Sequence, residues 1–199
     1  MIKIGITGNI AAGKSQAERI LEELGYKVID CDKINNRLLI EDAQTISLIK
    51  TEFGSSVFDE AGCISKQKLA EIVFKSRDKK LRLEEIMYKP ILREVNTFFD
   101  KNKNETMVFV SAALLFEAGW QNFFDKVIFV SAEENIRLER LMKRNGFSKL
   151  QAQQRINAQS SEADKIKKSD FVIYNNSNYE NLKKSVQDCI NYLNFYIHS

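Results

Sequence analysis

A glycine-rich loop near the N-terminus holds the residues whose types and spacing indicate chemistry most clearly. The loop reads Gly8-Asn9-Ile10-Ala11-Ala12-Gly13-Lys14-Ser15, which matches the phosphate-binding pattern of Gly, four residues, Gly, Lys and Ser or Thr. A chance match in a chain of this length has a probability of about one per cent. An apolar segment precedes the loop and an amphipathic helical segment follows it, so backbone N–H groups and a helix N-terminus converge on one anion. The loop therefore predicts a site for nucleotide phosphates.

Different residues of this loop have different expected roles. Lys14 is expected to neutralise the β and γ phosphates, and the Ser15 hydroxyl to bind Mg²⁺. Gly8 and Gly13 allow the backbone conformation and a close approach to the phosphates. The predicted nucleotide-binding set is completed by Ala11, Ala12 and Gln16. The alternative interpretation is a glycine-rich turn that carries a surface lysine.

Two carboxylates follow the second apolar run of the chain. The run Ile29-Asp30-Cys31-Asp32 places them where the phosphates arrive, and in an extended chain residues two apart point the same way. If a hydroxyl is the phosphoryl acceptor, one carboxylate can take its proton or orient it for in-line attack. We assign this role to Asp32, which lies further out of the strand. A helix cap is the alternative for an Asp at a strand end.

Arginines recur at helical spacing in the second half of the chain. Arg137, Arg140 and Arg144 share one helix face, and Arg155 follows in a polar segment. Phosphoryl transfer needs positive charge on the equatorial oxygens, and arginine supplies it through bidentate donors. We favour Arg140 and Arg144, because they lie nearest to a polar, basic helical segment at residues 148–168 that is expected to form a lid. For any one of the four, a solvated helix face is the alternative.

The elements that must position these residues alternate along the chain. Short apolar runs predict strands at residues 2–7, 27–30, 107–111, 127–130 and 171–174. Helical spacing predicts helices at residues 15–24, 133–145 and 179–197. Ser131 with Glu134 is the expected capping box of the second helix, and Gly25 and Gly146 are expected helix stops. Alternation of this kind predicts an α/β fold with a five-stranded parallel sheet flanked by helices.

Residues 33–103 interrupt the alternation. Helical patterning covers residues 42–53, 66–75 and 77–101, the last broken at Pro90, with one weak strand-turn signal at residues 58–64. We expect a helical insertion beside the carboxyl edge of the sheet, where open α/β sheets bind their ligands. The chain is thus predicted to be a single domain that carries this insertion and the lid.

Composition and charge exclude several classes of protein. The 199 residues are 44% hydrophobic and 29% charged, as in ordinary globular proteins. A net charge of +3 is too small for a chain that works mainly on a nucleic-acid backbone, and no apolar run approaches the about 18 residues of a membrane helix. We therefore expect neither nucleic acid nor a membrane as partner. The three separated cysteines fit a reducing cytoplasm, and the single histidine, His198, argues against histidine-based catalysis.

Six blocks of sequence, in order and spacing, resemble the dephospho-coenzyme A kinase family along nearly the whole chain. They are residues 4–15, 28–32, 62–74, 114–117, 155–159 and 169–175. The resemblance implies a P-loop kinase fold and transfer of the γ-phosphoryl group of MgATP to the ribose 3′-hydroxyl of dephospho-coenzyme A. It implies that Asp32 is the base, that the insertion receives dephospho-coenzyme A, that the lid covers ATP, and that Asn175 belongs to the ATP site. Lys89 stands where the family usually has His.

Three alternatives remain at this point. Another P-loop kinase, for a nucleoside monophosphate or a small metabolite, would share the loop, fold and lid. A GTPase-type switch would use Asp59 to Gly62 as its Asp-x-x-Gly element, but the chain has no Asn/Thr-Lys-x-Asp guanine motif, and these residues also fit a turn. A non-catalytic relative that only binds coenzyme A is disfavoured because Lys14, Ser15 and Asp32 are all present. The sequence sets no oligomeric state, and a monomer is compatible with it.

Overall fold

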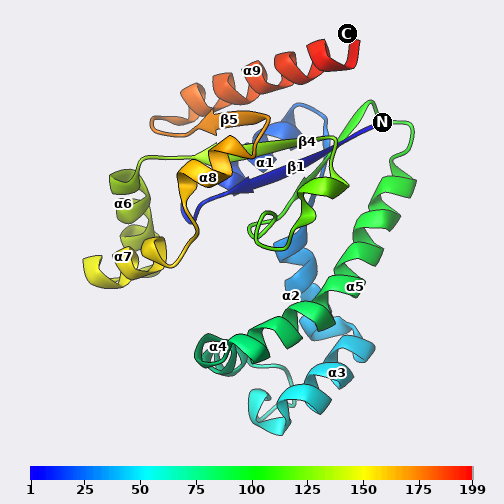
Figure 1. The fold of residues 1–199 in the computed structure, drawn as a ribbon, viewed down its shortest axis with the longest axis vertical. Coiled ribbons are helices and arrows are strands. Elements are labelled where there is room, and N and C mark those ends of the chain that lie inside the picture. Colours follow the sequence, from blue (N-terminus) through cyan, green and yellow to red (C-terminus); the bar gives the residue numbers. More distant parts are fainter. Residues whose placement is uncertain (199) are drawn as a thin grey trace. The chain divides into compact units, whose positions relative to one another are not determined.

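The computed structural model describes residues 1–198, and the side chains of residues 1–196; the His198 side chain lies outside that range. Five strands form one sheet: β1 (Ile2–Gly8), β2 (Lys27–Asp30), β3 (Met107–Ser111), β4 (Lys126–Ser131) and β5 (Phe171–Tyr174). Their order is β2-β3-β1-β4-β5 (Figure 1). β1 pairs in parallel with β3 and β4, and β4 with β5. The predicted five-stranded parallel sheet is confirmed.

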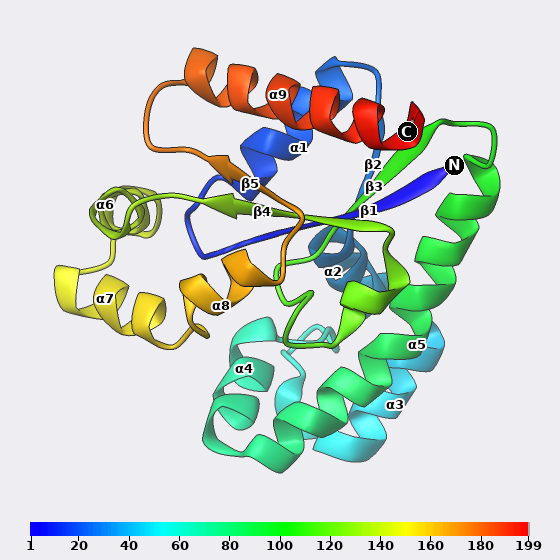
Figure 2. The same cartoon turned by 45° about the horizontal axis from the view of Figure 1, so that its top comes forward.

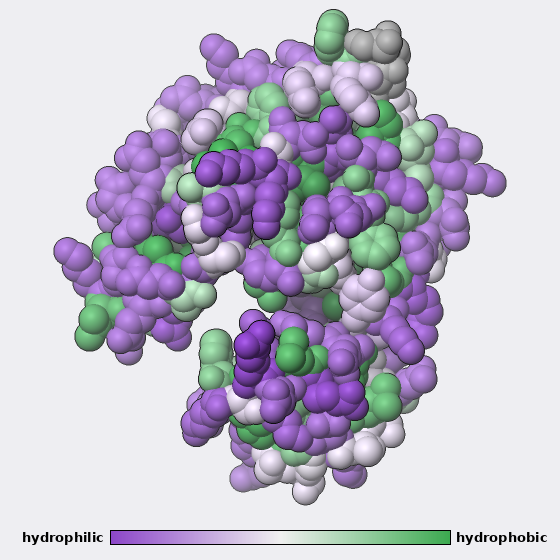
Figure 3. All heavy atoms as spheres, viewed as in Figure 1, coloured by the Kyte–Doolittle hydropathy of each residue, from purple (hydrophilic) through white to green (hydrophobic). Residues whose placement is uncertain are grey.

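The chain folds into two compact units. The sheet unit comprises Met1–Ile29 and the chain from Asn102 onward, and the helical unit comprises Asp30–Lys101. The helices of the sheet unit are α1 (Lys14–Glu23), the 3-10 helix η2 (Trp120–Phe123), α6 (Glu134–Asn145), α7 (Lys149–Asn157), α8 (Glu162–Lys167) and α9 (Tyr179–His198). On the face seen in Figure 3, hydrophilic side chains cover most of the surface. Among the described residues, the helices lack the length and apolar character needed to cross a membrane.

The core of the sheet unit lies between the central strands and two helices. Strand residues such as Ile4, Phe109 and Ile128 are buried together with residues of α1 and α9. Figure 2 shows α1 and α9 on the same face of the sheet. Because parallel strands are covered on both faces, they read as nearly continuous apolar runs, which is why the sequence predicts them so well. This core fixes the end of β1 and the start of α1, the two elements that the phosphate-binding loop connects.

The cap of α6 differs from the prediction. The N-cap residue is Glu133, which makes no side-chain cap, and Ser131 is the last residue of β4. Its hydroxyl donates to Glu162 instead, so the predicted capping box is wrong because a distant carboxylate competes for the hydroxyl. A capping box does form at α7, between Ser148 and Gln151. The predicted helix stop at Gly146 is confirmed, with a left-handed φ of 67°.

The helical unit consists of α2 (Cys31–Glu41), α3 (Ala43–Phe53), the 3-10 helix η1 (Ser55–Val57), α4 (Lys66–Lys75) and α5 (Arg77–Lys101). The expected break at Pro90 is wrong, because α5 runs through it. Buried residues lie on both sides of the proline, among them Met87 and Ile91, and their packing holds the helix across the missing N–H. The weak strand signal corresponds to an isolated antiparallel bridge between Phe58 and Ile64.

A small second core joins α6 to α7 in the sheet unit. Leu141, Ala152 and Ile156 are buried in it, and Ile10 and Ala11 of the phosphate-binding loop pack against them. Figure 1 shows α6 and α7 side by side beyond the end of β4. The N-terminal part of the predicted lid is thus attached to the loop by apolar contacts.

Leu141→Ala tests this attachment. Leu141 is fully buried, so its truncation is expected to lower the free energy of unfolding by about 2 to 5 kcal/mol. The matched control is Leu150→Ala on α7, where the leucine is 69% exposed and a change within about 0.5 kcal/mol is expected. Urea unfolding followed by circular dichroism measures both. Equal losses in the two variants would contradict the assignment of Leu141 to a core.

Candidate functional site

The phosphate-binding loop leaves β1 at Gly8 and enters α1 at Lys14. The N–H of Ala12 donates to the Asn9 carbonyl at 3.0 Å, and Gly13 has a left-handed φ of 100°. A Cβ on Gly13 would lie 2.0 Å from Nδ2 of Asn175. Gly13 is therefore required twice, for its backbone conformation and for the space that a side chain would take from Asn175.

Asn175 is the buried residue that supports the loop from behind. Its Nδ2 donates to the Ala12 carbonyl at 2.8 Å and to Oε1 of Gln16 at 3.4 Å, and only 2% of the residue is exposed. Its backbone N–H donates to the Ser131 carbonyl at 2.8 Å. Asn175 thus links the end of β4 to the loop and to α1.

Of the two favoured arginines, the structure brings Arg140 to the loop. Its guanidinium donates to the Ala11 carbonyl at 3.3 Å, to the Ala12 carbonyl at 3.4 Å and to the Asn175 carbonyl at 3.0 Å. Burial lowers the pKa of this guanidinium from its ordinary value. Arg144 is exposed and donates to Asn145 on its own helix. Helical spacing therefore placed Arg140 and Arg144 on the same helix, α6, but of the two only Arg140 donates to loop carbonyls.

The other two arginines have partners of their own. Arg137 is 4% exposed, donates to the Ala132 carbonyl at 2.9 Å and pairs with Glu162 at 3.1 Å. The guanidinium carbon of Arg155 lies 4.0 Å from the ring centroid of Phe147. Arg137 is thus part of a largely buried ion pair, and Arg155 stacks on the ring of Phe147.

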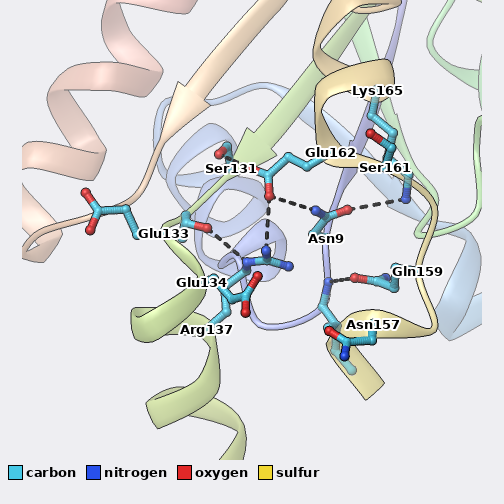
Figure 4. A network of polar contacts seen from close by, with 12 residues as sticks. Asn9, Ser131, Glu133, Glu134, Arg137, Asn157, Gln159, Ser161, Glu162 and Lys165 are labelled. Carbon is cyan, nitrogen blue, oxygen red and sulfur yellow. Dashed lines mark hydrogen bonds and ion pairs between the residues drawn. The ribbon is translucent and has the colours of Figure 1, made fainter. Parts of the chain in front are cut away.

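A polar network joins the loop to α8 (Figure 4). Asn9, 5% exposed, donates to Glu162 at 3.0 Å and accepts from Lys165 at 3.3 Å. The Ile10 N–H donates to Oε1 of Gln159 at 2.8 Å. In Figure 4 the side chains of Gln159, Glu162 and Lys165 point toward the first half of the loop from the segment that contains α8. The C-terminal part of the predicted lid is therefore tied to the loop by hydrogen bonds.

The same network includes a carboxylate from the sequence block at residues 114–117. Lys165, 2% exposed, pairs with Glu117 at 2.7 Å, and the Ser160 hydroxyl donates to Glu117 at 2.7 Å. Partial burial acts to raise the pKa of Glu117, but hydrogen bonds from Lys165 and Ser160 outweigh it and lower this pKa from its ordinary value. Glu117 therefore serves as the counter-ion of a buried lysine.

Lys14 contacts the buried residues Glu18 and Ser111. Its Nζ lies 3.0 Å from Oε1 of Glu18 and 2.6 Å from Oγ of Ser111, and the Ser111 hydroxyl donates to the same Glu18 oxygen at 2.5 Å. Sequence reasoning missed Glu18. A signal was present, because Glu18 follows Lys14 by four residues and falls among the apolar positions of α1 that become buried.

The two carboxylates after β2 adopt different local roles. Asp30 is the N-cap of α2 and accepts from the N–H groups of Asp32 at 2.8 Å and Lys33 at 3.4 Å. Asp32 is an exposed residue in the first helical turn. The expectation that both point the same way from an extended chain is wrong, because the helix begins at Cys31. The cap alternative holds for Asp30.

The turn expected at Asp59 is also present. The Asp59 carboxylate accepts from the N–H groups of Ala61 at 3.0 Å and Cys63 at 2.9 Å. Asp59 to Gly62 thus form a turn stabilised by its own side chain, as the interpretation against a GTPase-type element requires.

Comparisons with known proteins agree with one another. Residues 2–181 match the family model described as dephospho-CoA kinase. A dephospho-CoA kinase of Fusobacterium nucleatum is 36% identical over 184 residues, which cover 92% of this chain and 94% of the relative. A crystal structure from Thermus thermophilus has a TM-score of 0.85 at 29% identity, and covers 96% of this chain and 97% of that chain. A dephospho-CoA kinase from Campylobacter jejuni has a TM-score of 0.69 at 29% identity, with 96% of both chains covered.

Gly13→Ala tests the geometry of the loop. A left-handed backbone costs a residue with a side chain about 1 to 3 kcal/mol, and the new methyl group would also displace Asn175. We expect ATP affinity to fall about tenfold or more, since about 1.4 kcal/mol corresponds to tenfold. Titration with a fluorescent ATP analogue measures it.

The matched control is Gly25→Ala. Gly25 has a φ of 90°, and a Cβ there would meet nothing within 4 Å. Its replacement therefore introduces similar backbone strain away from the loop, and ATP affinity should stay at the wild-type value. A similar loss of affinity in both variants would show that the contact with Asn175 is unimportant.

Proposed function

The chain belongs to the dephospho-CoA kinase family, and from this premise we propose that it transfers the γ-phosphoryl group of ATP to the ribose 3′-hydroxyl of dephospho-CoA. The products are CoA and ADP, in the last step of coenzyme A biosynthesis. The observation that carries the proposal is the family match over residues 2–181. The loop from Gly8 to Ser15 accounts for the ATP half of the reaction, because it lies between a strand and a helix N-terminus as phosphate loops do.

The loop and α1 are the proposed phosphate-binding elements. The N–H groups at the start of α1 and the Lys14 ammonium stabilise the charge on the phosphates. Ala11, Ala12 and Gly13 supply the loop backbone, and we propose that Asn175 and Gln16 keep it in place. The hydrogen bonds from the Asn175 amide to the Ala12 carbonyl and to the Gln16 side chain support this role. Catalysis by such a site consists mainly of positioning and electrostatic stabilisation.

Arg140 is the proposed arginine of the catalytic set. Its burial and its bonds to the Ala11 and Ala12 carbonyls support a position against the loop, where its charge adds to the positive potential at the phosphates. For Arg144, which bonds to Asn145, ATP binding is proposed from its helical spacing and its nearness to the proposed lid alone. The segment 148–168 is the proposed lid over ATP, and its contacts with Asn9 and Ile10 support a close association with the loop.

A kinase that uses ATP requires a divalent metal ion, and we propose Mg²⁺ with Ser15 as a ligand. The local donor set fits this ion, because the Glu18 carboxylate and the Ser111 hydroxyl also supply oxygen, the atom that Mg²⁺ prefers. Bound there, the ion would neutralise charge on the phosphates.

The helical unit, Asp30–Lys101, is the proposed receiver of dephospho-CoA. Asp32 accepts or orients the proton of the attacking hydroxyl, and its exposure at the start of α2 supports access to a substrate. ATP and dephospho-CoA are the only partners that the proposal needs, and a monomer suffices. Cys31, Cys63 and Cys189, all within the described residues, form no disulfide, which supports the proposed cytoplasmic location.

An acceptor panel tests the function. The purified protein is incubated with MgATP and dephospho-CoA, AMP, CMP, pantothenate or no acceptor, and ADP release is followed with mass confirmation of the product. We expect ADP release coupled to CoA formation with dephospho-CoA alone. Turnover with another acceptor would overturn the substrate assignment, and ATP binding without transfer to any acceptor would overturn the proposed catalysis.

Asp32→Asn tests the proposed base. The amide cannot take a proton, so turnover is expected to fall by about two orders of magnitude or more, while ATP affinity is retained. The matched control is Glu41→Gln at the other end of α2, where the side chain is 63% exposed, and turnover should stay at the wild-type level. Initial rates of ADP release with dephospho-CoA measure both variants. Unchanged turnover in Asp32→Asn would remove Asp32 from the mechanism.

A further inference from the structure

Glu18 is a buried carboxylate next to the residues that bind phosphate, and the proposed mechanism names it only as an oxygen donor that fits the metal ion. Its side chain is 5% exposed and that of Lys14 is 12% exposed. One carboxylate oxygen, Oε1, receives both the Lys14 ammonium at 3.0 Å and the Ser111 hydroxyl at 2.5 Å. A carboxylate remains buried only where such partners offset the loss of water.

Binding of ATP removes one of the two partners that stabilise the buried Glu18 carboxylate. Lys14 must turn its ammonium group toward the phosphates, which leaves Glu18 with Ser111 as its partner in the cluster. A buried carboxylate beside a polyphosphate is repelled strongly, because the local dielectric constant is low. The carboxylate therefore needs a new cation when the nucleotide is bound, and the divalent ion that accompanies ATP is the one that the reaction supplies.

The positions of the neighbouring hydroxyls support the same conclusion. Ser15 and Glu18 are three residues apart on α1 and so share a helix face. Ser111 ends β3 and pairs with Ile6 of β1, the strand that leads into the loop. In P-loop enzymes the metal is held by the loop Ser or Thr and by an aspartate at a strand end. Here the strand end carries a hydroxyl, and that hydroxyl donates to Glu18.

We propose that Glu18, oriented by Ser111, supplies from α1 the metal-binding carboxylate that the end of β3 lacks. Before ATP binds, Glu18 holds the Lys14 ammonium. When ATP binds, Glu18 exchanges Lys14 for the divalent cation, and Lys14 moves to the phosphates. This inference rests on the proposed function, because it concerns the metal that accompanies ATP.

Glu18→Gln tests the proposal through metal binding rather than turnover. A fluorescent ADP analogue is bound to the protein, and Mg²⁺ is titrated into the complex. The substitution keeps the size of the side chain and removes its charge, so the Mg²⁺ concentration at half-saturation is expected to rise about 10- to 100-fold. Affinity for the analogue without metal should not fall, because Lys14 loses a competing carboxylate. The control is Glu22→Gln, exposed one turn further along α1, which should titrate as wild type.

A second pair of variants separates a metal role from a purely structural one. Glu18→Gln combined with Ser111→Asp returns a carboxylate to the cluster from the strand end, and should restore most of the Mg²⁺ affinity. Ser111→Ala keeps the charge of Glu18 but removes the hydrogen bond that the Ser111 hydroxyl donates to it. This variant should therefore weaken Mg²⁺ binding by a smaller factor than Glu18→Gln does. Ser111→Ala also carries the test if Glu18→Gln fails to fold, as judged by circular dichroism.

The outcomes are distinct. If Glu18→Gln changes affinity for the analogue equally with and without Mg²⁺, Glu18 is only the counter-ion of Lys14 and the proposal is overturned. An unchanged Mg²⁺ titration in Glu18→Gln also overturns the proposal. If Glu18→Gln does not fold, an unchanged Mg²⁺ titration in Ser111→Ala overturns it instead. If the wild-type protein binds no ADP analogue at all, the proposed function fails, and this inference fails with it.

Discussion

The phosphate-binding loop depends on one buried side chain, the amide of Asn175. It donates to the Ala12 carbonyl at 2.8 Å and fills the space that a side chain on Gly13 would need. Its backbone N–H is bonded to the Ser131 carbonyl, and its own carbonyl accepts from Arg140. The loop is therefore held from outside, by the ends of β4 and β5 and by α6. Such support orients the loop before a nucleotide arrives, which is how a site stabilises charge without reorganising.

Three cations near the loop are buried or mostly buried, and each is paired with a carboxylate. The pairs are Lys14–Glu18 at 3.0 Å, Arg137–Glu162 at 3.1 Å and Lys165–Glu117 at 2.7 Å. Because breaking a buried pair is costly, a nucleotide that draws on one of these cations must compete with its carboxylate. The last two pairs share Asn9, which bonds to both Glu162 and Lys165. The contacts that join the loop to the segment of α8 are made by Asn9 and Ile10, so a change of partner at Lys14 breaks none of these bonds.

Local signals predicted most of the fold, and two of their failures arose where packing or a distant partner intervened. The strands at residues 27–30, 107–111 and 171–174 have their predicted bounds. The signal is strongest at residues 107–111, which are all buried and nearly all apolar. Ser131 has the spacing of a helix cap, but its hydroxyl bonds to Glu162, 31 residues away. Pro90 has the chemistry of a helix breaker, but buried neighbours on both sides keep α5 continuous. In both of these cases, tertiary contacts outweighed a local conformational preference worth about 1 to 3 kcal/mol.

The sequence by itself determined the phosphate-binding loop, the order of strands and helices, and the resemblance that indicates the reaction, because these depend on residues close together in the chain. The tertiary structure decided which side chains surround the loop. Asn175 meets Ala12 across 163 residues, and Ser111 meets Lys14 across 97. Such contacts depend on which strand ends lie side by side in the sheet. That arrangement follows from packing of the whole core, and the spacing of residues in any one segment does not encode it.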